Sequence, residues 1–473
     1  MTYAGIAAPL DQAAIALYFV LLSICGYFTR RSRNFSDYAV GRHTVPAMMI
    51  FASLAAAIIG PGFSVGSAGQ AYQIGFLFYF LCLSYAVQTI VVGRFVAPRL
   101  TAHRDCSTLG DVMRKCYGPL AQTLTGFICI GLLVGFTAVM GRIGGEMLSE
   151  MTGWPLTVCL VAVTGATALL TFTGGLRATV ATEGLQFALF AIMIPVMLWI
   201  ALGKSPESLA QLAERANAMT AQGYADKTVL QMIAIAVSFM LGEALLPTYV
   251  NRALAAQSAR SSRLGFVMAG AYVAVWLAIV ALVGIVGRAS LPPGTAPDSV
   301  FVLLARQVLP AGLYGMLLAA LVGIVMSSQE ATLNCASVSL VRDLAQRLLR
   351  LSESAELLLA KAATLVLGAL AIVIAQFSPS IIDGLMLLYS IWAPTVLLPL
   401  IAALYVREPR ALAGNLAMIA GGLASLVWRV ALHEPQGIPA ILVGLAAAGA
   451  AYLLGHILGQ PTAVPQSRLE ASS

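Results

Sequence analysis

The chain has 473 residues, of which 59% are hydrophobic and only 10% are charged, whereas soluble domains carry roughly 25% charged residues. This composition excludes an ordinary soluble protein and predicts a polytopic membrane protein. The net charge of +7 does not indicate nucleic-acid binding, because Lys and Arg in cytoplasmic loops orient membrane proteins. The seven cysteines form no CxxC pair or metal-spaced cluster, so we interpret them as small apolar core residues.

Apolar windows of about 20 residues, the length that crosses the hydrocarbon core, follow one another along the chain. They lie near 12–29, 46–68, 75–98, 119–148, 155–175, 182–203, 228–250, 264–287, 312–341, 357–376, 380–405, 412–432 and 437–458. The predicted fold class is an all-α polytopic membrane protein with about 13 transmembrane helices. We expect one membrane domain over residues 1–459 and a short cytoplasmic tail over 460–473. Alternate loops concentrate Lys and Arg, which places the N-terminus outside and the C-terminus inside the plasma (inner) membrane.

The second to sixth and the seventh to eleventh spans form two sets of five, over about 46–203 and 228–405. An odd number of spans in each set means that the two sets enter the membrane from opposite sides, which predicts an inverted repeat. Between the eighth and ninth spans, residues 287–310 are rich in Pro and Gly. We expect an outer loop there with a short helix, placed as a lid over the outer vestibule.

Each set begins with an interrupted helix. The first interruption is Gly60-Pro61-Gly62, and the second lies between Gly242 and Pro247. Proline cannot donate to the helical ladder and glycine tolerates unusual backbone angles, so carbonyl groups are freed at these positions. Paired interruptions of this kind are typical of secondary transporters, whose unwound carbonyls bind ions near the membrane midplane. A kinked helix whose carbonyls are satisfied by neighbouring side chains is the alternative.

Four motifs, in this order, resemble the sodium:solute symporter family. They are ASLAAAIIGPGFSVGSAGQAYQIG over 52–75, GGLRATVATEGLQ over 174–186, GEALLPTYVNRALAA over 242–256 and IVMSS over 324–328. The resemblance implies a core similar to the LeuT-like inverted repeat, preceded by an extra helix. It also implies a sodium-coupled secondary active symporter, not an enzyme, that takes up a small organic solute by alternating access. The expected partners are Na⁺, that solute and membrane lipid, with no nucleic acid and with a functional monomer.

Carried over to this sequence, the family's sodium site would use the backbone carbonyls of Ala56, Ile59 and Ile324 and the hydroxyls of Ser327 and Ser328. The spacing is compatible with this role, because the two serines lie one helical turn after Ile324 and hard cations prefer oxygen ligands. Serines in membrane helices also commonly bond the carbonyl four residues earlier, which is the alternative.

The resemblance to the proline-carrying branch places the substrate near the first interruption and near three residues of the fourth and seventh spans. The predicted substrate residues are Gly60, Gly62, Phe63, Phe136, Phe239 and Glu243. Glu243 departs from the family, and a carboxylate at membrane depth marks a functional site unless it is a structural partner, for example of Arg142. The expected solute is amino-acid-like, a carboxylate or a quaternary amine, and Glu243 beside aromatic rings favours an amine or quaternary ammonium group.

Two charged residues are predicted to gate the sodium exit path, Glu183 and Arg252. The alternative for Glu183 is that it complements a helix dipole. Glu330 and Ala331 stand where some family members add hydroxyls for a second sodium ion, so we expect one Na⁺ per cycle. A proton-coupled transporter that uses Glu330 with Glu183 is an alternative function, and a membrane sensor module of the same fold is another.

Overall fold

The computed structural model describes residues 8–29, 34–60, 62–377 and 381–460; Pro61 and the tail predicted after residue 460 lie outside the described residues. Within these ranges the chain is almost entirely helical, and the one extended pairing is an isolated bridge between Val45 and Ala256. The predicted all-α fold class is therefore confirmed.

The first half of the chain builds the elements up to the second interruption. They are α1 Pro9–Thr29, α2 Phe35–Val40, η1 Gly41–His43, α3 Ala47–Ile58, η2 Gly62–Gly66, α4 Ser67–Ile74, α5 Phe76–Val91, η3 Val92–Val96, α6 Ala97–Leu100, α7 Leu109–Tyr117, α8 Pro119–Thr152, α9 Leu156–Lys204, α10 Leu209–Asp226 and α11 Val229–Gly242. The polar connections between them carry the caps that end and start helices, such as Asn34 before α2 and Thr108 before α7.

The second half follows the interruption and ends with a helix pair. Its elements are α12 Pro247–Ala255, α13 Ala259–Ser290, η4 Pro297–Ser299, α14 Val300–Val308, α15 Leu313–Ser339, η5 Leu340–Ala345, α16 Gln346–Leu349, α17 Glu353–Phe377, α18 Ile381–Trp392, η6 Ala393–Leu397, α19 Leu398–Tyr405, α20 Ala411–Leu426, η7 Val427–Ala431, η8 Pro435–Gly437 and α21 Ala440–Leu458. In the described ranges, 10 helices are long and apolar enough to cross a membrane, and two bent pairs raise the number to 12. The shorter apolar helix α1 is additional.

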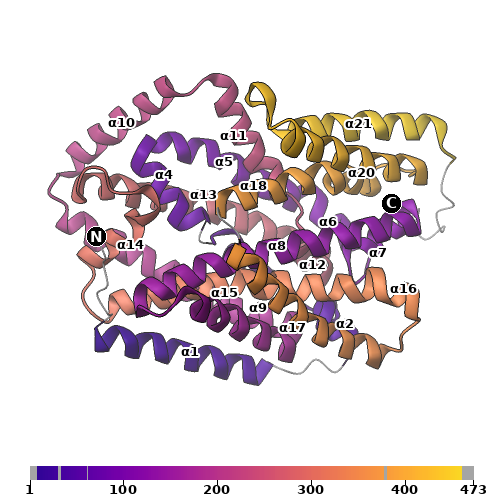
Figure 1. Cartoon of the computed structure of the whole chain (residues 1–473), viewed down its shortest axis with the longest axis horizontal. Helices are drawn as coiled ribbons and strands as arrows, with labels where there is room; N and C mark the ends of the chain where they lie inside the picture. The colour runs from indigo at the N-terminus through magenta and orange to yellow at the C-terminus, as the bar shows by residue number, and fades with distance from the viewer. Residues whose placement is uncertain (1–7, 30–33, 61, 378–380, 461–473) are drawn as a thin grey trace.

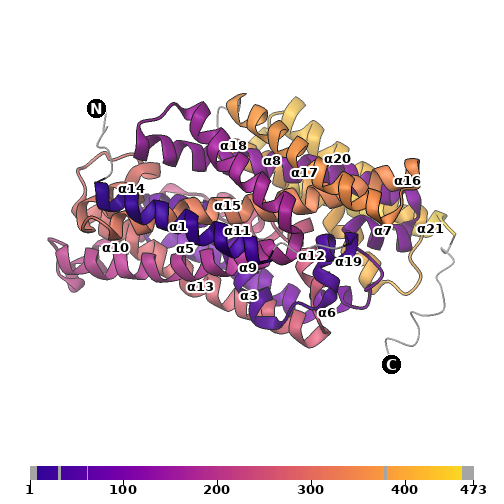
Figure 2. The same cartoon turned by 90° about the horizontal axis from the view of Figure 1, so that it is seen from below.

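Helix α15 lies at the centre of the molecule (Figure 1). Nearly all of its residues are buried, and it packs against α8, α9, α17 and α1. Helices α3, α4 and α5 pack on α13, and α20 pairs with α21 at one edge of the molecule (Figures 1 and 2). Its second half carries polar side chains, including Ser327, Glu330 and Asn334, which are costly in lipid and are covered by the neighbouring helices. The serine-bearing helix is therefore held rigidly inside the bundle.

Both predicted interruptions are present. Helix α3 ends at Ile58 and the chain resumes helical structure at Gly62, with the two parts bent by 61°. The second break runs from Gly242, the last residue of α11, to Pro247, the first residue of α12. Leu245 within it has a φ of 54°, a conformation that a branched side chain rarely adopts. The unwound backbone lies inside the protein, as backbone at membrane depth must.

The pair Gly174-Gly175 of the second sequence motif marks a sharp bend in α9. Gly175 has φ 60° and ψ −160°, and a Cβ atom there would lie 2.6 Å from Cδ2 of Tyr38. Only glycine meets both conditions. The fifth and sixth predicted spans are thus the two arms of one bent helix.

Two stretches between the predicted spans differ from the sequence-based expectation or extend it. The stretch between the sixth and seventh spans, predicted as a loop, forms the amphipathic helix α10, whose start is fixed by a capping box between Ser208 and Gln211. The short helix expected in residues 287–310 is α14, but α13 first extends to Ser290.

Candidate functional site

Glu243 lies in the second helix break and is surrounded by three tyrosines from three different helices. The hydroxyl of Tyr85 on α5 donates to Glu243 Oε2 at 2.8 Å, and that of Tyr249 on α12 donates to the same oxygen at 3.1 Å. Tyr389 on α18 donates to Oε1. The alternative that Glu243 pairs with Arg142 is wrong, because Arg142 binds Glu146 one turn along α8.

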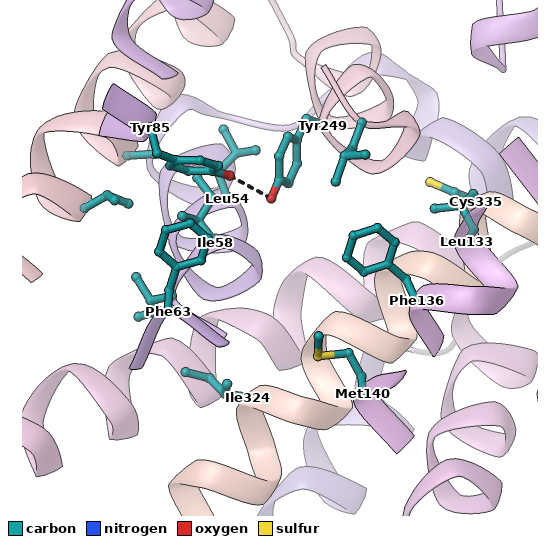
Figure 3. Packing of buried hydrophobic residues seen from close by; sticks show 14 of the residues in the cluster. Leu54, Ile58, Phe63, Tyr85, Leu133, Phe136, Met140, Tyr249, Ile324 and Cys335 are labelled. Atoms are coloured by element: carbon teal, nitrogen blue, oxygen red, sulfur yellow. Dashed lines mark hydrogen bonds between the residues drawn. The ribbon is translucent and has the colours of Figure 1, made fainter. Parts of the chain in front are cut away.

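Aromatic rings extend this cluster in both directions. The ring of Phe63, directly after the first break, lies 4.7 Å from that of Tyr85 and 5.6 Å from that of Phe239, measured between centroids. On the opposite side, the ring of Phe136 lies 5.6 Å from that of Tyr389. Figure 3 shows Phe63 and Tyr85 facing Phe136 across the site, with Tyr249 between them. All four predicted side chains of the substrate site therefore gather around the two breaks.

The predicted glycines are at the edge of the same site. A Cβ atom added at Gly62 would meet nothing within 4 Å, and one added at Gly60 would come to 3.5 Å from Ser328 Oγ. The first position borders open space beside Phe63, whereas the second faces α15. Gly60 thus links the aromatic cluster to the serine pair.

The serine pair on α15 presents its hydroxyls in two different ways. Ser328 Oγ donates to the carbonyl of Ile324 at 3.1 Å, which is the common back-bond of serine in helices. Ser327 Oγ is fully buried and has no hydrogen-bond partner in the described part of the chain. A buried hydroxyl without a partner costs free energy, so a bound group that contacts this oxygen would be stabilised there.

A buried ion pair lies below the site and joins three helices. Arg252 Nη2 on α12 is 2.6 Å from Glu183 Oε1 on α9, and the two side chains are 1% and 0% exposed. Ser53 on α3 donates to the other oxygen of Glu183 and accepts from Arg252 Nε at 3.0 Å. The two residues predicted as a gate are thus in direct contact, and Ser53 connects them to the first broken helix.

Backbone contacts reinforce this junction. The N–H of Val45 donates to the carbonyl of Ala255 at 3.0 Å, and the N–H of Gln257 donates to the carbonyl of Val45 at 3.0 Å. His43 Nδ1 lies 2.6 Å from the carbonyl of Leu254. The segment before α3 and the end of α12 are therefore tied together on the side of the molecule that carries Arg252.

The model of the sodium:solute symporter family matches residues 38–422, which is most of the chain. The chain belongs to this family. It is 27% identical to the sodium/pantothenate symporter of Escherichia coli over 96% of this chain and 97% of that protein, and 27% identical to the sodium/proline symporter of Salmonella typhimurium over 96% and 94%. It is 23% identical to the dog sodium/myo-inositol cotransporter over 90% of this chain and 68% of that protein.

Solved structures of other transporters share the fold. A Na⁺-coupled sialic acid symporter in a substrate-bound outward-open state superposes with a TM-score of 0.84 at 16% identity, over 96% of this chain and 99% of that one. A nucleobase-cation-symport-1 family transporter superposes with a TM-score of 0.56 at 13% identity, over 90% and 95%. The predicted LeuT-like architecture is confirmed at the level of the fold.

A sodium:solute symporter needs oxygen ligands for its ion, and the donor set here fits that need. The unpartnered hydroxyl of Ser327 is a neutral oxygen, as hard monovalent cations prefer. The carbonyl of Ile59, just after α3, accepts the hydroxyl of Ser64 at 2.6 Å and keeps a second lone pair. The carbonyl of Ile324 lies inside α15 and accepts the hydroxyl of Ser328 at 3.1 Å in addition to its place in the helical ladder. Ala56 lies in the last turn of α3, where carbonyls lose their helical partners.

In this symporter, Glu330 is buried one turn beyond Ser327 on α15. Its Oε2 lies 2.6 Å from Thr182 Oγ1, and Oε1 has no hydrogen-bond partner among the described residues. Thr182 is adjacent to Glu183 on α9, so the contact between α9 and α15 that holds Glu330 lies beside the ion pair of Glu183 and Arg252.

Sequence reasoning identified the breaks, the serines and the gating charges, but it missed several contact residues. Tyr85, Tyr249 and Tyr389 hold Glu243, and none of them was among the predicted site residues. Ser53 was also missed, although its position one turn before Ala56 on a polar-poor helix was a usable signal.

Proposed function

We propose that this protein carries a small organic solute together with Na⁺ by alternating access around the site between its two helix breaks. The observation that carries the proposal is the meeting of the two breaks. Phe63 follows the first break and stacks beside Tyr85, whose hydroxyl binds Glu243 in the second break. A solute can bind to one unwound segment while the other changes its backbone angles during opening and closing. Unwound backbone permits such changes because it has no helical hydrogen bonds to break.

The proposed sodium ligands are the hydroxyls of Ser327 and Ser328 and the carbonyls of Ala56, Ile59 and Ile324. Two elements supply them, α15 and the end of α3. Sodium binding would therefore fix α3 against the rigid central helix. Fixing α3 also places Phe63 at the solute, which gives a physical route from sodium binding to solute binding.

The structure supports a further proposal about conformation and orientation. With Arg252, Glu183 and Ser53 joined and Val45 bridged to Ala256, the side that carries these residues is closed. Loops rich in Lys and Arg lie on that same side in the predicted topology, so we infer a closed cytoplasmic gate, an outer N-terminus and a cytoplasmic C-terminus. A functional monomer in the inner membrane, expected from the family resemblance, is also part of the proposal.

The proposal can be tested by uptake into proteoliposomes. A panel of labelled small solutes is first offered with and without an inward sodium gradient. With any solute that accumulates, the double variant Ser327→Ala/Ser328→Ala is then compared with Ser337→Ala, a matched buried serine on the same helix that bonds its own backbone. Losing two of five ligands should raise the sodium concentration for half-maximal uptake at least about tenfold, or about 1.4 kcal/mol, while the control changes it little.

Two results would contradict the proposal at different points. If no solute accumulates in response to a sodium gradient, the transport function itself is wrong. If uptake in the double variant keeps the sodium dependence of the parent protein, the function stands and the assignment of the sodium ligands is wrong.

A further inference from the structure

The carboxylate of Glu243 carries a charge for which the structure shows no basic partner. Among the described residues, no Lys, Arg or His lies within ion-pair distance of it. Two other glutamates of the helical bundle do have basic partners. Glu183 pairs with Arg252, and Glu146 pairs with Arg142. A buried carboxylate is expensive unless a positive group or several hydrogen bonds compensate for it. Glu243 has the hydrogen bonds but lacks the positive group.

The hydrogen bonds around Glu243 suit the ionised form. Each of the three phenols has one proton to donate, and each contacts a carboxylate oxygen, two at Oε2 and one at Oε1. An ionised carboxylate has about four acceptor positions, so three donors leave about one position and the net charge available. The three tyrosines come from three different helices, so their hydroxyls hold the carboxylate in one orientation.

The surroundings of the carboxylate reach an accessible space. Glu243 and Phe63 are each 8% exposed and Phe136 and Tyr249 each 7%, whereas Ile324, deeper against α3, is 0% exposed. The rings of Phe63 and Phe136 lie on opposite sides of Tyr249, whose hydroxyl binds Glu243 (Figure 3). Gly62 borders open space at the same place, because an added Cβ would meet nothing within 4 Å.

A negative charge among aromatic faces is the arrangement that recognises organic cations. The ring faces attract a cation through their quadrupole, and the carboxylate supplies direct charge pairing in a medium of low dielectric constant. A solute that is only anionic would be repelled by Glu243, and a neutral polyol would leave its charge uncompensated.

We propose that the solute carries an amine or quaternary ammonium group that docks against Glu243 between the rings of Phe63 and Phe136. This inference rests on the proposed transport function and names the substrate class of the same site. Zwitterions that contain such a cation are included. The cationic group then takes the place of the missing basic side chain, and the tyrosines keep the carboxylate pointed at it.

Binding to the purified full-length protein tests the inference separately from transport. Choline and 3,3-dimethyl-1-butanol have nearly the same shape, but only choline is charged, so the difference between them isolates the charge. Calorimetric titration in sodium-containing detergent solution should show choline or glycine betaine binding at least about tenfold more tightly than the uncharged alcohol, which is about 1.4 kcal/mol. Glu243→Gln keeps the shape and should remove this preference, whereas Glu214→Gln on the exposed face of α10 should keep it.

The variant Tyr389→Phe is a control for loss of binding through a folding defect. It leaves the carboxylate in place, removes one hydroxyl, and should weaken cation binding less than Glu243→Gln does. Equal affinity of the parent protein for choline and the alcohol, or tighter binding of an anionic carboxylate, would overturn the inference. So would a Glu243→Gln protein whose cation affinity is intact and whose uptake has lost its pH dependence, because Glu243 would then be a proton site. Cation binding that depends on Glu243 without any sodium-driven uptake would support the inference and refute the proposed transport.

Discussion

The buried pair of Glu183 and Arg252 makes a quantitative prediction about the gate. Removing one member of a fully buried ion pair costs about 3–5 kcal/mol, because the other charge is left uncompensated. In Glu183→Gln this cost applies only while the gate is closed, since water solvates Arg252 once the gate opens. The open state should therefore gain about 3 kcal/mol relative to the closed state, which is about a hundredfold in population.

Cys335 is a native reporter of this opening. Its Sγ lies 3.9 Å from the carbonyl of Pro247, the first residue of the helix that carries Arg252, and the side chain is 4% exposed. With the other cysteines replaced by alanine, its rate of reaction with a water-soluble maleimide in proteoliposomes should follow the open population. We expect a rise of about a hundredfold in Glu183→Gln.

The double variant Glu183→Gln/Arg252→Gln decides between a latch and general damage. Removing both charges of a buried pair is often nearly neutral, so the double variant should react much more slowly than Glu183→Gln. If the single variant reacts at the parent rate, the pair does not hold the gate closed. If the double variant reacts as fast as the single one, the effect is not an interaction between the two charges.

Two other predictions concern stability and topology. Asp11 on α1 accepts hydrogen bonds from the backbone N–H groups of Gly312 and Gly315 at 2.7 and 2.8 Å and so caps α15. Asp11→Ala should lower the free energy of unfolding by about 1–2 kcal/mol, and Asp11→Asn should lower it less. Thermal unfolding in detergent measures this, and an unchanged melting temperature would exclude the cap. A reporter fused after Ser473 should be active only in the cytoplasm and a cysteine at Ala221 should react with an impermeant reagent from outside, whereas the opposite pattern would reverse the proposed orientation.

The features predicted correctly from the sequence are those that depend on local chemistry. Apolar windows located the membrane helices because each must satisfy its own backbone in lipid. The two breaks followed from Gly60-Pro61-Gly62 and from the stretch between Gly242 and Pro247, because proline cannot donate to the helical ladder and glycine tolerates unusual backbone angles. Glu183 and Arg252 were singled out by the family resemblance instead; the structure places the two in contact, and their gating role stays a prediction.

The features that were missed depend on tertiary packing. Tyr389 reaches Glu243 across 146 residues of sequence, and a tyrosine on an apolar helix looks like an ordinary packing residue until its partner is known. Helix α10 was missed because its sequence is rich in small and polar residues, and its buried face, formed by Leu212, Ala216 and Gly223, carries only one large apolar side chain. The different hydrogen bonding of Ser327 and Ser328 could not be predicted either. Adjacent side chains on a helix point about 100° apart, and the neighbouring helices decide which hydroxyl finds a partner.

The bridge between Val45 and Ala256 has a consequence for how the protein can evolve. Its two hydrogen bonds join main-chain atoms, so they do not depend on which side chains occupy the segment. The ion pair nearby, in contrast, is tied to specific residues. Substitutions can therefore change Glu183, Arg252 or Ser53 while the main-chain bonds still join the segment before α3 to the end of α12. Relatives that carry different solutes could therefore keep the same alternating-access cycle.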